Sequence, residues 1–143
     1  MCAVGLKMIK FTKKMNSLNN ICLLLAEDNL LNQRVASLVL RQMGIQFDIA
    51  SNGKEVIELV RKKKYHIILM DIHMPIIDGL EATRQIREFE KESNISLPNF
   101  IVALSATELL ENRGVCIQAG MDEFIEKPIK ESVLRKLLSR VIV

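Results

Sequence analysis

The chain has 143 residues, of which 49% are hydrophobic and 26% are charged. This length and composition predict one globular domain with a sizeable core, and they exclude a disordered tail protein, a collagen and a disulfide-stapled miniprotein. The three cysteines are too few and too scattered for a disulfide framework or a zinc site, which indicates reduced thiols and a cytoplasmic protein. No apolar run approaches the roughly 20 residues that cross a bilayer, so we expect no transmembrane segment.

The net charge of +3 is distributed unevenly along the chain. Residues 1–20 contain four lysines and no acidic residue, whereas residues 21–143 contain 16 basic and 17 acidic residues. A nucleic-acid-binding domain needs a basic face, so the nearly neutral main segment argues against nucleic acid as a partner. We expect residues 1–20 to be a flexible basic tail; the alternative is an amphipathic helix on a membrane surface. The amphipathic alternative rests on five apolar residues of this tail that recur at helical spacing, namely Val4, Met8, Phe11, Met15 and Leu18.

From residue 21 onward, five short apolar runs alternate with five amphipathic patterns. The apolar runs are typical of strands buried on both faces, and they predict strands at 21–26, 45–50, 66–71, 100–104 and 122–126. The amphipathic patterns predict helices at 29–43, 53–63, 80–92, 107–118 and 130–140. This alternation predicts an α/β fold of the (βα)5 type, a parallel sheet covered on both faces, over residues 21–143.

Local signals refine three of these helices. In the first helix, the expected apolar stripe consists of Leu31, Val35, Leu38, Val39 and Met43. Ser51 or Asn52 is expected to cap the second helix, and Thr107 the fourth, because these short polar side chains accept hydrogen bonds from the first helical N–H groups.

Polar side chains follow four of the five predicted strands. Glu27 and Asp28 follow the first, Asp71 ends the third, Ser105 follows the fourth, and Lys127 follows the fifth. Ligands of parallel α/β sheets bind beyond the carboxyl ends of the strands, so these side chains are expected to share one edge. Close carboxylates repel each other, and Mg²⁺ is a counter-charge that prefers oxygen ligands and accompanies phosphate. The set predicts magnesium-assisted phosphoryl transfer to an aspartate.

Four segments, 26–36, 70–79, 103–106 and 120–128, together resemble the response-regulator receiver domain. They are most similar to receivers attached to hybrid sensor histidine kinases, and the resemblance covers about residues 20–141. The resemblance implies a flavodoxin-like, doubly wound sheet with strand order 2-1-3-4-5. It also implies a phosphoacceptor in a two-component phosphorelay, with a histidine kinase or histidine phosphotransfer protein as the phosphodonor.

The resemblance assigns the phosphoryl-binding residues. Asp71 would accept the phosphoryl group, and Lys127, Ser105 and Ala106 would bind it. Pro128 would follow a cis peptide bond. The domain would then not be an enzyme in the ordinary sense, because it only transfers a phosphoryl group to its own Asp71 and slowly loses it again.

The resemblance also assigns a magnesium site. Asp28, Asp71 and the backbone carbonyl of His73 would bind Mg²⁺ directly, and Glu27 would act through a metal-bound water. The side chain of His73 is an alternative ligand, because it lies two residues from Asp71.

Ser105 and Phe124 would form the switch that reports phosphorylation. A bound phosphoryl group would draw Ser105 inward, and Phe124 would rotate into the space behind it. The surface over residues 107–141 would then change shape and signal by protein contact, with homodimerisation through this surface as one outcome.

Two other functions remain open at this point. A phosphatase of the haloacid dehalogenase type uses similar residues, but it has a second aspartate where this chain has His73, and it usually carries a cap domain. A pseudo-receiver would bind its partner without phosphorylation. A stand-alone receiver and a piece of a longer hybrid kinase are both compatible with the sequence.

Overall fold

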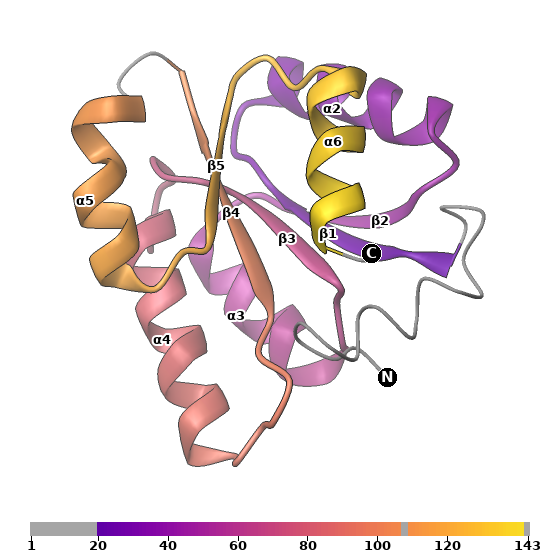
Figure 1. Cartoon of the computed structure of the whole chain (residues 1–143). Helices are drawn as coiled ribbons and strands as arrows, with labels where there is room; N and C mark the ends of the chain where they lie inside the picture. Colours follow the sequence, from indigo (N-terminus) through magenta and orange to yellow (C-terminus); the bar gives the residue numbers. More distant parts are fainter. Residues whose placement is uncertain (1–19, 107–108, 142–143) are drawn as a thin grey trace.

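The structure, a computed structural model, describes residues 20–106 and 109–141. Within these ranges, five parallel strands form one sheet in the order β2-β1-β3-β4-β5, with five helices around it (Figure 1). The strands are β1 (Cys22–Ala26), β2 (Gln46–Ala50), β3 (Ile67–Asp71), β4 (Phe100–Ser105) and β5 (Glu123–Glu126). The helices are α2 (Leu30–Gln42), α3 (Gly53–Lys62), α4 (Gly79–Glu92), α5 (Leu109–Ala119) and α6 (Glu131–Val141).

This architecture confirms the flavodoxin-like (βα)5 fold and the expected strand order. Every predicted strand and helix is present, with ends that differ from the prediction by at most two residues. The tail expected over residues 1–20 lies, apart from Asn20, outside the described residues, and so does the proposed cap Thr107.

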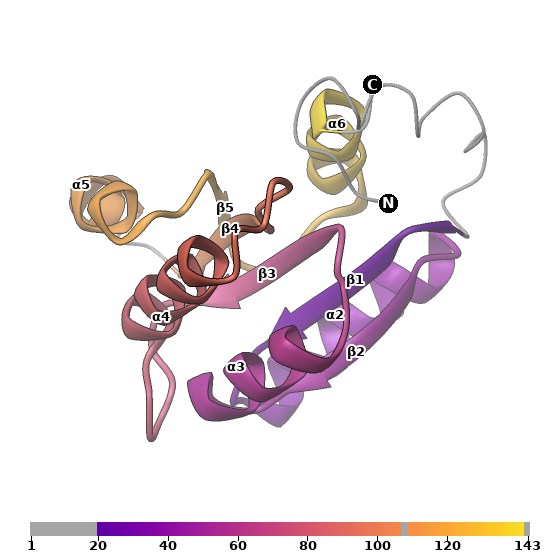
Figure 2. The ribbon, with the colours of Figure 1, turned by 90° about the horizontal axis from the view of Figure 1, so that it is seen from below.

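The helices cover the sheet on both faces. One apolar layer contains residues of α2 and α6, and the other contains residues of α3 and α4 together with Cys116 of α5. In Figure 1, α6 lies in front of the sheet and α3 lies behind it, and Figure 2 gives the same layers seen from below. Because successive side chains of a strand point to opposite faces, both layers draw on β1, which reads as one continuous apolar run.

The orientation of α2 differs from the prediction. Leu31 and Leu38, expected on its buried stripe, are 69% and 58% exposed. The buried side chains of the helix are instead Gln33, Ala36, Ser37 and Leu40. The amide of Gln33 donates a hydrogen bond to the backbone carbonyl oxygen of Glu27 at 2.5 Å, and this partner allows a polar side chain to occupy the inner face.

Polar caps begin three helices next to the carboxyl edge of the sheet. The side-chain oxygens of Asn29, Asn52 and Asp78 accept hydrogen bonds, at 2.8–2.9 Å, from the backbone N–H three residues ahead. Asn52, rather than Ser51, therefore caps α3. These caps fix where each chain segment turns from the sheet edge into its helix.

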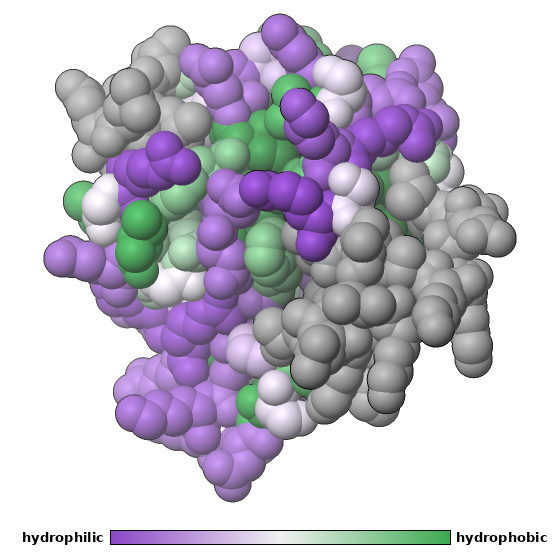
Figure 3. Space-filling view, viewed as in Figure 1, coloured by the Kyte–Doolittle hydropathy of each residue, from purple (hydrophilic) through white to green (hydrophobic). Residues whose placement is uncertain are grey.

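The outer surface is not uniform. On the side of the molecule seen in Figure 3, hydrophilic residues cover α4, whereas apolar surface gathers between α5 and α6. Among the described side chains, Val115 and Ile117 of α5 and Val133 of α6 are large, apolar and at least 42% exposed. Both α5 and α6 thus expose apolar side chains to solvent.

Candidate functional site

The three predicted carboxylates meet at the carboxyl edge of the sheet. Glu27 and Asp28 follow β1, and Asp71 ends β3, which pairs directly with β1. One carboxylate oxygen of each residue lies within 4.8 Å of those of the other two. Glu27 and Asp71 are buried, at 1% and 4% exposure, whereas Asp28 is exposed. The cluster is therefore anchored in the fold and open to solvent on one side.

Lys127, which follows β5, crosses to this cluster. Its Nζ lies 3.2 Å from Oε1 of Glu27 and 3.2 Å from Oδ2 of Asp71. Burial alone would lower the pKa of Lys127, but the charges of Asp71 and Glu27 and their hydrogen bonds outweigh burial and raise it. The ammonium is therefore held in its charged form between the two buried acids.

The N-terminus of α2 positions Glu27. Its Oε2 accepts hydrogen bonds from the backbone N–H of Asn29 at 3.2 Å and from Nδ2 of Asn32 at 3.4 Å. Burial, and then the charge of Asp71, raise the pKa of Glu27, while the contacts with Asn29 and Lys127 oppose this shift. The sequence alone did not indicate a role for Asn32 or Gln33. Only their spacing after the acidic pair, Glu27 and Asp28, could have indicated one.

The loop after β3 fits closely around Asp71. The backbone N–H of His73 donates to Oδ1 of Asp71 at 3.2 Å, and the His73 side chain is exposed. The N–H of Gly79, at the start of α4, donates to the carbonyl oxygen of Ile72 at 2.8 Å. A Cβ at position 79 would lie 2.1 Å from the carbonyl oxygen of Asp71, so only glycine fits there.

Strands β4 and β5 complete the edge. Ser105 is buried at the end of β4, and its carbonyl oxygen accepts a hydrogen bond from the backbone N–H of Lys127 at 2.6 Å. The peptide bond between Lys127 and Pro128 is cis, as the resemblance implies. Phe124 lies further back on β5, where it pairs in register with Ala103 and is half-buried.

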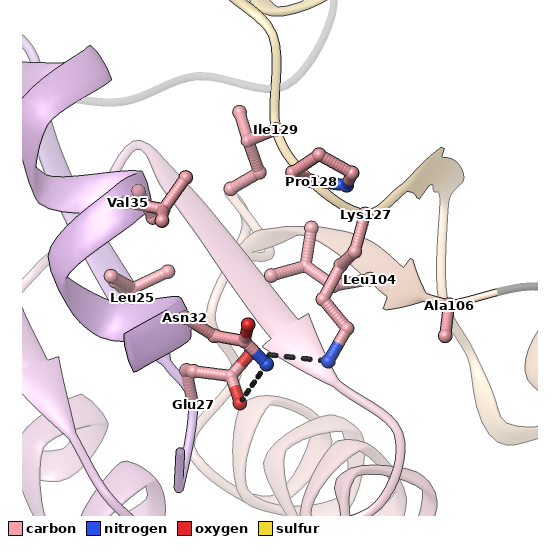
Figure 4. Close-up of a pocket in the computed structure, with 10 residues that line it drawn as sticks. Leu25, Glu27, Asn32, Val35, Leu104, Ala106, Lys127, Pro128 and Ile129 are labelled. Carbon is pink, nitrogen blue, oxygen red and sulfur yellow. Dashed lines mark hydrogen bonds and ion pairs between the residues drawn. The ribbon is translucent and has the colours of Figure 1, made fainter. Parts of the chain in front are cut away.

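A cavity of about 270 Å³ adjoins the acidic cluster on the α2 side of the sheet (Figure 4). Its polar lining comes from Glu27, Asn32 and Lys127, which point toward one another in Figure 4. Its remaining lining residues are Leu25, Val35, Ala36, Leu104, Ala106, Pro128 and Ile129. The predicted residue Ala106 is exposed and lies on this lining, whereas Phe124 does not line it.

The donor set consists of the carboxylate oxygens of Glu27, Asp28 and Asp71. Such hard oxygen donors, two of them buried and one open to solvent, fit a hard divalent cation that keeps part of its water shell. Among the residues that the structure describes, no helix is both long and apolar enough to span a membrane.

The fold and this acidic edge define a receiver. The family model for the response regulator receiver domain matches residues 23–139, and the chain belongs to this family. Receiver domains are signalling domains rather than classical enzymes, so the phosphatase alternative is not supported.

Among its relatives, hybrid signal transduction histidine kinase K of Dictyostelium discoideum is 41% identical over 122 residues. The match covers 83% of this chain but 10% of that kinase, so the chain spans about a tenth of this relative.

Two solved structures are similar as well. The receiver in the co-crystal structure of the Saccharomyces cerevisiae histidine phosphotransfer protein Ypd1 with Ssk1 has 31% identity and a TM-score of 0.79, over 85% of this chain and 88% of that one. The receiver of sensor histidine kinase PA1611 from Pseudomonas aeruginosa has 36% identity and a TM-score of 0.74, over 85% of this chain and 97% of that one. The PA1611 structure has a magnesium ion in its active-site cleft.

Proposed function

We propose that the chain accepts a phosphoryl group on Asp71 from a phosphohistidine of a partner protein. The observation that carries this proposal is the placement of Lys127, whose ammonium lies 3.2 Å from both Asp71 and Glu27. An aspartate can receive a phosphoryl group only where the incoming negative charge is neutralised, and a fixed ammonium beside the acceptor supplies part of that neutralisation.

Each residue at the carboxyl edge of the sheet has its own role in the transfer. An oxygen of Asp71 attacks the phosphorus, a P–O bond forms as the P–N bond to the donor imidazole breaks, and the imidazole nitrogen keeps the electron pair. Lys127 holds one phosphoryl oxygen, and Ser105 and Ala106 bind another. Attack by water on the same phosphorus slowly returns free Asp71. Nothing else is turned over.

We propose Mg²⁺ as the cofactor of this site. Asp28, Asp71 and the backbone carbonyl of His73 would hold the ion, and Glu27 would contact one of its waters. When bound, Mg²⁺ supplies positive charge that draws phosphoryl oxygens toward Asp71. The magnesium ion in the PA1611 receiver supports this choice.

The donor we propose is a histidine kinase or a histidine phosphotransfer protein. The co-crystallised pair of Ypd1 and the Ssk1 receiver supports a phosphotransfer protein as partner. Leu30 and Leu31, at the start of α2 beside the acidic cluster, are 72% and 69% exposed and offer apolar contact area. We place the reaction in the cytoplasm, where reduced thiols such as Cys22 and Cys116 persist.

The output we propose is a change in the surface formed by α5, β5 and α6, residues 109–141. Ser105 would move toward the phosphoryl group, and Phe124 would rotate into the space behind it. The apolar surface between α5 and α6 in Figure 3 suits a protein partner or a second copy of the chain. The phosphoryl group shifts this equilibrium only by its differential affinity for the two arrangements.

Intact mass spectrometry after incubation with Mg²⁺ and acetyl phosphate tests the proposed function. We expect one added phosphate that is lost in base, and none after Asp71→Asn or in EDTA. Asp78→Asn is a matched control, because it changes an acid in the same loop and asparagine also caps helices. Phosphate that still appears on the Asp71→Asn variant would rule out Asp71 as the acceptor.

A further inference from the structure

Ile76, in the loop between β3 and α4, has a backbone conformation that its side chain disfavours. Its φ is 72°, in the left-handed region that a β-branched residue rarely adopts. The backbone N–H of Ile77 donates to the carbonyl oxygen of Pro75 at 2.8 Å, which closes a γ-turn with Ile76 at its centre. A γ-turn with a positive central φ is the rare, strained form of this turn.

The rest of the loop prevents Ile76 from relaxing. The backbone N–H of Gly53 donates to the carbonyl oxygen of Ile77 at 2.9 Å, and the N–H of Gly79 donates to that of Ile72 at 2.8 Å. Asp78, between them, caps α4. In Figure 2, the loop projects beyond the end of β3. The two hydrogen bonds hold its base. The fold therefore imposes the turn whatever residue occupies position 76.

Packing does not explain the choice of isoleucine. The side chain of Ile76 is 75% exposed, more than any other large hydrophobic side chain that the structure describes. Glycine or asparagine would adopt a positive φ at lower cost and would expose less apolar surface. An apolar side chain kept at a strained, exposed position points to a role outside the folded domain.

The position of the loop indicates what would cover Ile76. The loop leaves the sheet at Asp71, and its His73 N–H contacts the Asp71 carboxylate. A phosphohistidine can react only when its phosphorus reaches an oxygen of Asp71, so the surface that carries it must cover this edge of the sheet. Leu30 and Leu31 begin α2, on one face of the sheet, and the Ile76 loop bonds to α3, on the other. A protein donor would therefore find exposed apolar side chains on both sides of Asp71.

We propose that Ile76 is a recognition residue for the protein phosphodonor. The partner is a histidine phosphotransfer protein with apolar side chains around its phosphohistidine, and Ile76 packs against those side chains when the two proteins meet. This inference rests on the proposed function. It adds that the strained backbone at position 76 lowers the folding stability of the receiver, and that this loss is retained because Ile76 recognises the donor.

Two phosphodonors distinguish an effect on recognition of the protein donor from an effect on the phosphoryl transfer itself. Phosphorylation rates are measured with acetyl phosphate, which presents no protein surface, and with phosphorylated Ypd1. We expect Ile76→Asn and Ile76→Ala to slow transfer from Ypd1 by about tenfold, the loss expected for one buried aliphatic side chain. The rate with acetyl phosphate should stay unchanged. Ile49→Ala is the matched control, because it removes another exposed isoleucine, 40% exposed on β2, and should leave both rates unchanged.

A stability measurement tests the strain. Ile76→Asn should raise the midpoint of urea unfolding, because asparagine tolerates the positive φ. Such a rise would also exclude unfolding of the variant as the cause of slower transfer. Equal slowing with both donors, or no slowing with either, would overturn the inference, and so would a wild-type chain that accepts phosphate from acetyl phosphate but not from Ypd1. A wild-type chain that accepts phosphate from neither donor would instead refute the proposed function.

Discussion

The guanidinium carbon of Arg113, on α5, lies 4.7 Å from the centre of the Phe124 ring, on β5. At this distance the positive charge is attracted to the face of the ring. The contact joins α5 to the aromatic residue that we propose as part of the switch. Rotation of Phe124 into the space behind Ser105 would break this contact, so the contact should oppose the proposed rotation.

Removing this contact should make activation easier. An exposed cation–π contact corresponds to a factor of about two to five in an equilibrium constant. We expect Arg113→Ala to lower, by this factor, the concentration of the phosphate mimic beryllofluoride that half-converts amide NMR signals of residues 113–126. Arg113→Lys, which keeps the charge, should have a half-converting concentration between those of wild type and Arg113→Ala. Identical midpoints for Arg113→Ala and wild type would show that the contact does not restrain the switch.

Gly79→Ala should disable the acceptor site. The new Cβ would lie 2.1 Å from the carbonyl oxygen of Asp71, so the loop must shift and move Asp71 with it. We expect phosphorylation by acetyl phosphate to fall at least about tenfold, since small displacements of reacting groups are costly. Gly114→Ala is the control, because a Cβ there meets nothing within 4 Å. That variant should phosphorylate normally and gain helix stability; normal phosphorylation of Gly79→Ala would contradict the geometry of the loop.

At the amino ends of the strands, opposite the acidic cluster, Arg87 should be the cation that contributes most to stability. It donates to Glu90 at 2.9 Å, to Asp122 at 2.8 Å and to the carbonyl oxygens of Asn99 and Gly120. Arg87→Ala leaves the Glu90 carboxylate, 5% exposed, without its counter-charge, and should lower the free energy of unfolding by about 3–5 kcal/mol.

Arg84→Ala provides the comparison for Arg87→Ala. Arg84 lies on the same helix and also pairs with a glutamate three residues away, but both members of that pair are largely exposed. Urea unfolding should show little change for this variant. Similar losses for the two arginine variants would mean that the buried network adds no more than a surface pair.

His66 should make stability depend on pH. Burial lowers its pKa, and Nδ1 of the neutral ring accepts a hydrogen bond from the backbone N–H of Cys22 at 2.9 Å. As the pH falls through about 6.5, the histidine of the unfolded chain gains a proton that the folded chain resists, so stability is lost. His66→Asn keeps an acceptor but cannot titrate. Between about pH 8 and about pH 5.5, wild type should lose more stability than this variant in urea unfolding; parallel losses would contradict the assignment.

Much of the fold and site could be predicted because they depend on local patterns. The strands are buried on both faces and read as apolar runs, and parallel strands bring their carboxyl ends to one edge. Glu27, Asp71 and Lys127 could therefore be placed together without knowledge of any distance.

Other features depend on contacts that a sequence pattern does not contain. The inner face of α2 includes Gln33 because the Glu27 carbonyl lies within reach, and this partner becomes visible only in three dimensions. Hydrophobic periodicity instead favoured Leu31 and Leu38, which are exposed. The left-handed conformation of Ile76 was equally unpredictable, because isoleucine disfavours it and the surrounding hydrogen bonds impose it.

Acceptance of the phosphoryl group by Asp71 is tested most directly by locating the phosphate on the chain. After phosphorylation with acetyl phosphate and Mg²⁺, borohydride reduces an aspartyl phosphate to homoserine, and peptide mass spectrometry then reads the modified position. We expect homoserine at position 71 and aspartate at positions 28 and 78. Homoserine at any position other than 71, or none in a chain that has gained phosphate, would contradict this expectation.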